Sequence, residues 1–153
     1  MHQEAPLPHR RSFFQRHSLS IVSILFLIAW IVLYMLSSEK THLGSFFGNA
    51  IADWSGVVVT ILATKYLYEK GSVESRQPHD EQLGGVRKIL VDHSLSIFLV
   101  LTGAAWVTLY AVMDSESKWG QVIGNIVSEW TQIFALVILT KRLIEPHSKE
   151  SKK

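Results

Sequence analysis

His17-Ser18-Leu19-Ser20-Ile21 decides the architecture of this chain, because the same five residues return as His93-Ser94-Leu95-Ser96-Ile97. With this offset held, residues 17–77 align with residues 93–153 without a gap, and 21 of the 61 aligned pairs are identical. Self-similarity at a fixed period is typical of a duplicated structural unit. The sequence therefore predicts two copies of one unit, with a tail (1–16) before the first copy and a linker (78–92) between the copies.

Each copy contains two long apolar segments. Residues 18–38 and 94–113 include no charged side chain, and residues 48–68 and 124–144 are nearly as apolar. A helix of about 20 apolar residues is long enough to cross a hydrocarbon core of ~30 Å. The first run is longer than the apolar part of a signal peptide, so we expect it to be retained. We predict an all-α, polytopic membrane protein whose four transmembrane helices form two tandem hairpins.

The distribution of basic residues predicts the orientation of these helices. Thirteen of the 15 lysines and arginines lie in the tails, in the linker or at the ends of the spans that border them. The remaining two, Lys40 and Lys118, lie in the two short loops. Because cytoplasmic segments carry an excess of Lys and Arg, both termini and the linker are predicted to be cytoplasmic. The two hairpins then share one orientation, as in parallel repeats related by a pseudo-two-fold axis along the membrane normal.

The first helix of each copy carries aromatic residues at helical spacing. Trp30 and Tyr34 correspond to Trp106 and Tyr110, and steps of three, four and seven residues put such positions on one helical face. We interpret this face as a packing surface. Ser18 and Ser94 are expected to be the N-caps of these two helices.

The second helix of each copy contains a carboxylate in an apolar segment. Asp53 and Glu129 occupy equivalent positions, each four residues after an asparagine, Asn49 or Asn125. Helical steps from the two acids reach Gly56 and a set of polar residues: Thr60, Thr64, Gln132 and Thr140. Three interpretations stay open. The asparagines are N-caps with the acids in the first helical turn, the polar residues form interhelical hydrogen bonds, or they line an ion or proton path.

A second candidate site lies at the predicted cytoplasmic ends of the helices. The antiparallel hairpins bring basic, acidic and imidazole groups to one level: His17, His93, Lys65, Lys141, Glu69 and Glu145. Such a ring could respond to pH or bind a divalent metal. Close metal-ligand spacings are missing from the sequence, so no metal site is assigned.

Other function classes lack support in the sequence. The chain has no cysteine, which excludes disulfides and thiolate metal sites. A formal net charge of +2 is too small to indicate nucleic-acid binding. Signatures for phosphate loops, zinc hydrolases, nucleophile elbows and dinucleotide folds are missing, so we expect neither an enzyme nor a cofactor.

The order of motifs resembles a small, uncharacterised family of bacterial four-helix membrane proteins with a duplicated hairpin. The residues that carry the resemblance are His17–Ser20 with Asp53-Trp54 and Gly71–Pro78, followed by His93–Ser96, Glu129-Trp130 and Ser148–Ser151. The resemblance implies location in the bacterial cytoplasmic membrane and no particular activity.

Three functions follow as hypotheses. The first is a non-enzymatic membrane protein that assembles with itself or with a membrane protein partner through its small and polar helix faces. The second is an oligomeric cation-conducting pore with Asp53 and Glu129 at its outer mouth. The third is a metal- or pH-responsive membrane sensor that uses the cytoplasmic ring.

Overall fold

The structure, a computed structural model, describes residues 13–75 and 84–143. These residues form five helices and no β-strand. The helices are α1 (Phe13–Leu36), α2 (His42–Tyr66), α3 (Gly85–Asp92), α4 (Ser94–Val112) and α5 (Lys118–Leu139). The predicted all-helical class is therefore confirmed.

Four of the helices are long and apolar enough to cross a membrane, namely Arg16–Leu36 within α1, all of α2, all of α4 and all of α5. The shortest has 19 residues, which corresponds to a length of about 28 Å. Such a length matches the hydrocarbon thickness of a bilayer. The four predicted candidate spans are thus present, and α3 is a short additional helix.

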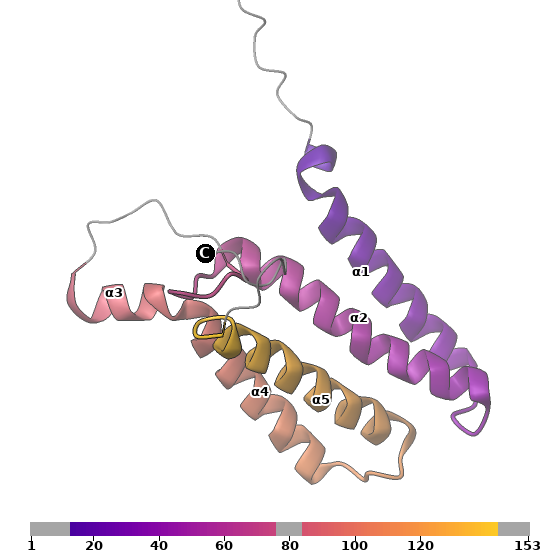
Figure 1. Ribbon diagram of the computed structural model, residues 1–153. Helices are drawn as coiled ribbons and strands as arrows, with labels where there is room; N and C mark the ends of the chain where they lie inside the picture. Colours follow the sequence, from indigo (N-terminus) through magenta and orange to yellow (C-terminus); the bar gives the residue numbers. More distant parts are fainter. Residues whose placement is uncertain (1–12, 76–83, 144–153) are drawn as a thin grey trace, which may run out of the picture.

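The four long helices pack in the order α1, α2, α5, α4 (Figure 1). Contacts join α1 to α2, α2 to α5, and α5 to α4, so α2 and α5 are the two central helices. The central helices are accordingly more buried than α1 and α4. Helix α3 contacts the start of α4 and points away from the axis of that helix (Figure 1). We call the end that contains residues 67–75, α3 and residues 140–143 the linker end, and the opposite end the loop end.

The two central helices begin in the same way at the loop end. The Thr41 hydroxyl accepts a hydrogen bond from the Gly44 N–H, and the Ser117 hydroxyl accepts one from the Gly120 N–H, each at 3.0 Å. Side-chain oxygens at this position satisfy N–H groups that have no partner inside the helix. A Cβ atom at Gly44 or Gly120 would overlap a carbonyl oxygen of the preceding loop. Thr41 and Ser117 are therefore the caps, and glycine is required three residues later.

This finding corrects the predicted role of Asn49 and Asn125. Both asparagines lie inside their helices, which begin several residues earlier than expected. Asp53 and Glu129 are consequently far from the first turn, and the interpretation as helix-start residues is wrong. The apolar run alone placed the start too late, because the helices also include the first residues 42–47 and 118–123, where polar residues and glycine interrupt the apolar pattern.

The predicted caps Ser18 and Ser94 are also wrong. Helix α1 begins at Phe13, so Ser18 lies in its interior, and the N-cap of α4 is His93. The Ser94 hydroxyl instead accepts a hydrogen bond from the Tyr68 N–H at 2.9 Å. Its role is to join two segments of the chain.

The aromatic face of α1 and α4 is a packing surface, as predicted. The Trp30 ring stacks on Phe47, and the Trp106 ring packs against Trp130 edge to face. Tyr34 is 2% exposed and donates its hydroxyl hydrogen to the Lys118 carbonyl at 2.6 Å. The end of α1 is thereby attached to the beginning of α5.

Candidate functional site

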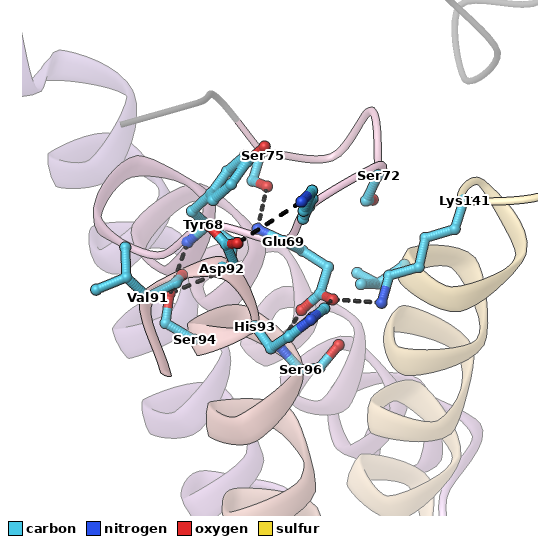
Figure 2. Close-up of polar contacts among 12 residues, drawn as sticks. Tyr68, Glu69, Ser72, Ser75, Val91, Asp92, His93, Ser94, Ser96 and Lys141 are labelled. Atoms are coloured by element: carbon cyan, nitrogen blue, oxygen red, sulfur yellow. Dashed lines mark hydrogen bonds and ion pairs between the residues drawn. The ribbon is translucent and has the colours of Figure 1, made fainter. Parts of the chain in front are cut away.

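The carboxylate of Glu69 lies at the centre of a polar junction at the linker end (Figure 2). Glu69 follows the end of α2 and has no exposed surface. Its Oε1 atom accepts hydrogen bonds from Lys141 Nζ and from His93 Nδ1, the latter at 2.6 Å. Its Oε2 atom accepts one from the Ser96 N–H at 3.0 Å. We call Glu69, His93, Ser96 and Lys141 the Glu69 junction.

The start of α4 is electrostatically suited to this carboxylate. Ser96 is the third residue of α4, where backbone N–H groups have no partner within the helix and the helix dipole favours negative charge. Burial by itself would raise the pKa of Glu69, but the hydrogen bonds from Lys141, His93 and Ser96 hold that pKa below its ordinary value. The carboxylate is therefore ionised at neutral pH and accepts all three hydrogen bonds.

Several further hydrogen bonds fasten residues 67–75 around the junction. Tyr68 bonds through its backbone to Ser94 and Leu95, and the Lys70 N–H donates to the Asp92 carbonyl at 2.7 Å. The Ser72 and Thr140 hydroxyls, both buried, lie 3.0 Å apart. The segment after α2 is thus bonded to the ends of both helices of the second repeat.

The structure divides the predicted cytoplasmic ring into separate groups. His93, Lys141 and Glu69 come together, whereas Lys65 Nζ donates to His17 Nδ1 at 2.8 Å. Glu145 lies outside the described residues. Within residues 13–75 and 84–143, no three His, Cys, Asp or Glu side chains are grouped so that they could hold a metal ion.

A second group of polar residues lies where α2 and α5 meet. Asn125 Nδ2 donates to Asn49 Oδ1 at 2.6 Å, so two residues at equivalent positions of the repeats bond to each other. The Glu129 side chain lies against Gly56, since a Cβ atom there would be 3.3 Å from Glu129 Oε2. We call the residues of this group the α2–α5 polar face: Asn49, Asp53, Asn125, Glu129 and Gln132.

The polar face is accessible and acidic. Asn49, Asp53 and Gln132 are exposed, and Asn125 and Glu129 are half-buried. Gln132 Nε2 donates to Glu129 Oε1 at 3.4 Å. Among the described residues, no basic nitrogen lies within 4 Å of either carboxylate. The face therefore presents two carboxylates without a cationic partner from the described part of the chain.

The three threonines of the predicted stripe have different surroundings. The Thr64 hydroxyl donates to the Thr60 carbonyl at 2.5 Å, and Thr64 lines a cavity beside α1. Thr140 is buried and contacts Ser72. The hydroxyl groups of Thr64 and Thr140 are thus engaged at the linker end.

The Glu69 junction contains contacts that sequence reasoning missed. The hairpin geometry put Glu69 level with His17 of its own repeat, but its partners come from the second repeat. The signal was present in the sequence, because His93 and Ser96 belong to the repeated pentapeptide. The pentapeptide defined the repeat, and the predicted ring put His93 at the level of Glu69, but the hydrogen bond from the Ser96 N–H to this carboxylate was not predicted.

Comparison with protein-family models, with curated proteins and with solved structures finds no match to this chain. Functional inference therefore depends on the geometry described above.

Proposed function

We propose that this chain is a non-enzymatic integral membrane protein that assembles with copies of itself through the α2–α5 polar face. The observation that carries the proposal is the exposure of Asn49, Asp53 and Gln132 on helices apolar enough to span a membrane. Such side chains, when they face lipid, lose hydrogen bonds to water without gaining others.

The depth of the carboxylates strengthens this argument. Asp53 and Glu129 each lie near the middle of their helix, roughly 16 Å from its first residue. A charged side chain at the centre of a transmembrane helix costs about 2.5–3.5 kcal/mol on insertion scales. Contact with polar groups of a second copy, or with water enclosed between copies, removes that cost. Because the face is on the surface of the single chain, a second copy can cover it.

The proposal includes an orientation and a symmetry. The resemblance to bacterial four-helix membrane proteins implies a location in the bacterial inner membrane, and the excess of basic residues in the tails and linker supports cytoplasmic termini. The linker end would then face the cytoplasm. Equivalent helix caps and the Asn49–Asn125 hydrogen bond support two parallel-related hairpins with a pseudo-two-fold axis near these asparagines.

Measurement of oligomeric mass in nanodiscs tests the assembly. We expect the wild-type protein to be an oligomer and the variant Asp53→Leu with Gln132→Leu to be a monomer. Thr108→Leu is a matched control, because Thr108 is an exposed polar residue on the peripheral helix α4. A monomeric wild-type protein, or equal dissociation of the control, would contradict assembly through this face.

A cation-conducting pore is the second candidate function. It is favoured by the two carboxylates of each copy, which lack a described basic partner and could attract cations if the assembled faces enclose water. Purified protein in liposomes should then conduct cations, and Asp53→Asn with Glu129→Gln should reduce the flux at least tenfold. Absence of flux from a proven oligomer eliminates the pore and leaves the assembly intact.

A further inference from the structure

A cavity of about 510 Å³ opens at the linker end between α1 and α2. Its described lining combines basic and hydroxyl side chains with apolar ones. The lining residues whose side chains carry a nitrogen or a hydroxyl group are Arg16, His17, Ser20, Thr64, Lys65, Tyr66 and Tyr68. Leu19, which is 65% exposed, contributes to the apolar part. A cavity of this size is within the range of small-molecule sites.

Three of these residues are the repeat equivalents of the groups that bind the Glu69 carboxylate. His17 corresponds to His93, Ser20 to Ser96, and Lys65 to Lys141. In the second repeat, this set holds two carboxylate oxygens. The first repeat therefore presents, in an open cavity, residue types that bind an oxyanion elsewhere in the same molecule.

The cavity is more basic than the junction it resembles. Arg16 stands at the position that Asp92 occupies in the second repeat. No carboxylate belongs to the described residues that line the cavity, and the Lys65 ammonium bonds to His17 rather than to an acidic side chain. The local charge thus favours a ligand with at least one full negative charge.

The donors available in the cavity suit a phosphate group. Helix α1 is continuous from Phe13, so the Ser20 backbone N–H lies in the helix interior and is used within the helix. The Ser96 N–H differs, because it lies in the first turn of α4 and donates to Glu69. Recognition must come from side chains, and lysine and arginine are the usual side-chain partners of phosphate. Basic groups beside an exposed apolar surface at the end of a membrane span match the interfacial region of a lipid, where the phosphate lies above the acyl chains.

We propose that this cavity binds the phosphate of an anionic glycerophospholipid, with Arg16 and Lys65 as the charged partners and Leu19 beside the acyl chains. The inference depends on the proposed membrane location. It does not depend on self-assembly.

Thermal unfolding of the full-length protein in mild detergent, with short-chain phosphatidylglycerol added, tests the proposal. We expect saturable stabilisation by phosphatidylglycerol and little by phosphatidylcholine of the same chain length. In Arg16→Gln with Lys65→Gln, the apparent affinity should fall roughly tenfold, since both charges near the anionic group are lost. Both side chains are exposed, so the variant is expected to fold, which circular dichroism verifies. Lys88→Gln is the matched control, because Lys88 is exposed at the same end and does not line the cavity.

Four results would overturn the proposal. Equal stabilisation by the two lipids excludes recognition of charge, and an equal loss in Lys88→Gln reduces the effect to general surface electrostatics. If inorganic phosphate, at the same concentration as the lipid, abolishes the stabilisation by phosphatidylglycerol, the cavity is a site for free anions. The fourth result is that Glu145→Gln lowers the melting temperature of the lipid-free protein but not that of the Arg16→Gln, Lys65→Gln variant. That result would show that the Glu145 carboxylate, rather than a lipid phosphate, fills the cavity. The oligomeric mass of the same samples tests self-assembly separately. Failure of the protein to insert into vesicles would refute the membrane location, on which the lipid site depends.

Discussion

The buried carboxylate of Glu69 is stabilised by partners that are far away in the sequence. A buried charge is tolerated when it is paired and its remaining lone pairs are hydrogen-bonded. Lys141, His93 and the Ser96 N–H meet this requirement together. Since Glu69 follows α2 while its partners belong to α4 and α5, the junction joins the two halves of the molecule at the linker end.

Replacing Glu69 with glutamine should destabilise the protein by about 2 kcal/mol. Removal of one partner from a fully buried pair costs about 3–5 kcal/mol, and we expect less here because the Lys141 and His93 side chains are 22% and 43% exposed. Reversible unfolding in mixed micelles measures the change. Glu116→Gln, at an exposed position of the loop end, is the control and should change the unfolding free energy by less than about 0.5 kcal/mol.

The lowered pKa of Glu69 predicts acid sensitivity. Its pKa in the folded protein lies below the ordinary value, so the stability it contributes is complete above the unfolded-state pKa of about 4.3. That contribution decreases as the pH falls toward and through the folded-state pKa. The difference in melting temperature between wild type and Glu69→Gln should therefore be present at pH 7 and shrink as the pH falls below about 4.3. A difference that stays constant down to pH 3 would show that ionisation of Glu69 does not stabilise the fold.

At the scale of the helix, close packing of a tyrosine against a glycine occurs in both hairpins. A Cβ atom at Gly48 would lie 3.1 Å from Tyr34 Cε2, and one at Gly124 would lie 3.0 Å from Tyr110 Cε2. The two tyrosines differ in their freedom to move. Tyr34 is buried and bonded to the Lys118 carbonyl, whereas Tyr110 is 43% exposed. Equivalent glycines of the repeat thus have different tolerance for a side chain.

Gly48→Ala should cost about 1–3 kcal/mol, the usual cost of overpacking, because Tyr34 cannot shift without breaking its hydrogen bond. Gly124→Ala should be close to neutral, since Tyr110 can rotate outward and alanine favours the helix by up to about 1 kcal/mol. Unfolding of the two variants under identical conditions provides the comparison, each serving as the control for the other. Equal losses would contradict the difference in mobility between the two tyrosines.

At the scale of the whole molecule, the orientation in the membrane can be tested with single cysteines, because the chain has none of its own. Ser115 lies in the loop before α5 and Val86 in α3, and both are exposed. In intact bacterial cells, a membrane-impermeant maleimide should label Ser115→Cys and leave Val86→Cys unlabelled until the inner membrane is permeabilised. The reverse pattern would show that the linker end faces outward and would refute the proposed topology.

The four long helices were predictable from local properties of the sequence, whereas the short helix α3 was not predicted. Apolar runs of suitable length predict spanning helices without reference to tertiary contacts, because the length is set by the thickness of the hydrocarbon core. The starts of α2 and α5 were not predicted correctly. Thr41 and Ser117 cap these helices by accepting hydrogen bonds from the Gly44 and Gly120 N–H groups, and hydropathy does not report such contacts.

The repeat alone located the paired positions Asn49 and Asn125, Asp53 and Glu129, and the two copies of the pentapeptide. Only the tertiary structure decided which of these pairs touch. Asn49 bonds to Asn125, its equivalent in the second repeat. Glu69 does not bond to His17 or Lys65 of the first repeat, but to His93 and Lys141 of the second. The physical reason is that a sequence repeat defines equivalent positions, whereas contacts across repeats depend on the order in which the helices pack. That order places α2 beside α5, and it leaves the second pentapeptide bound to Glu69 and the first beside an open cavity.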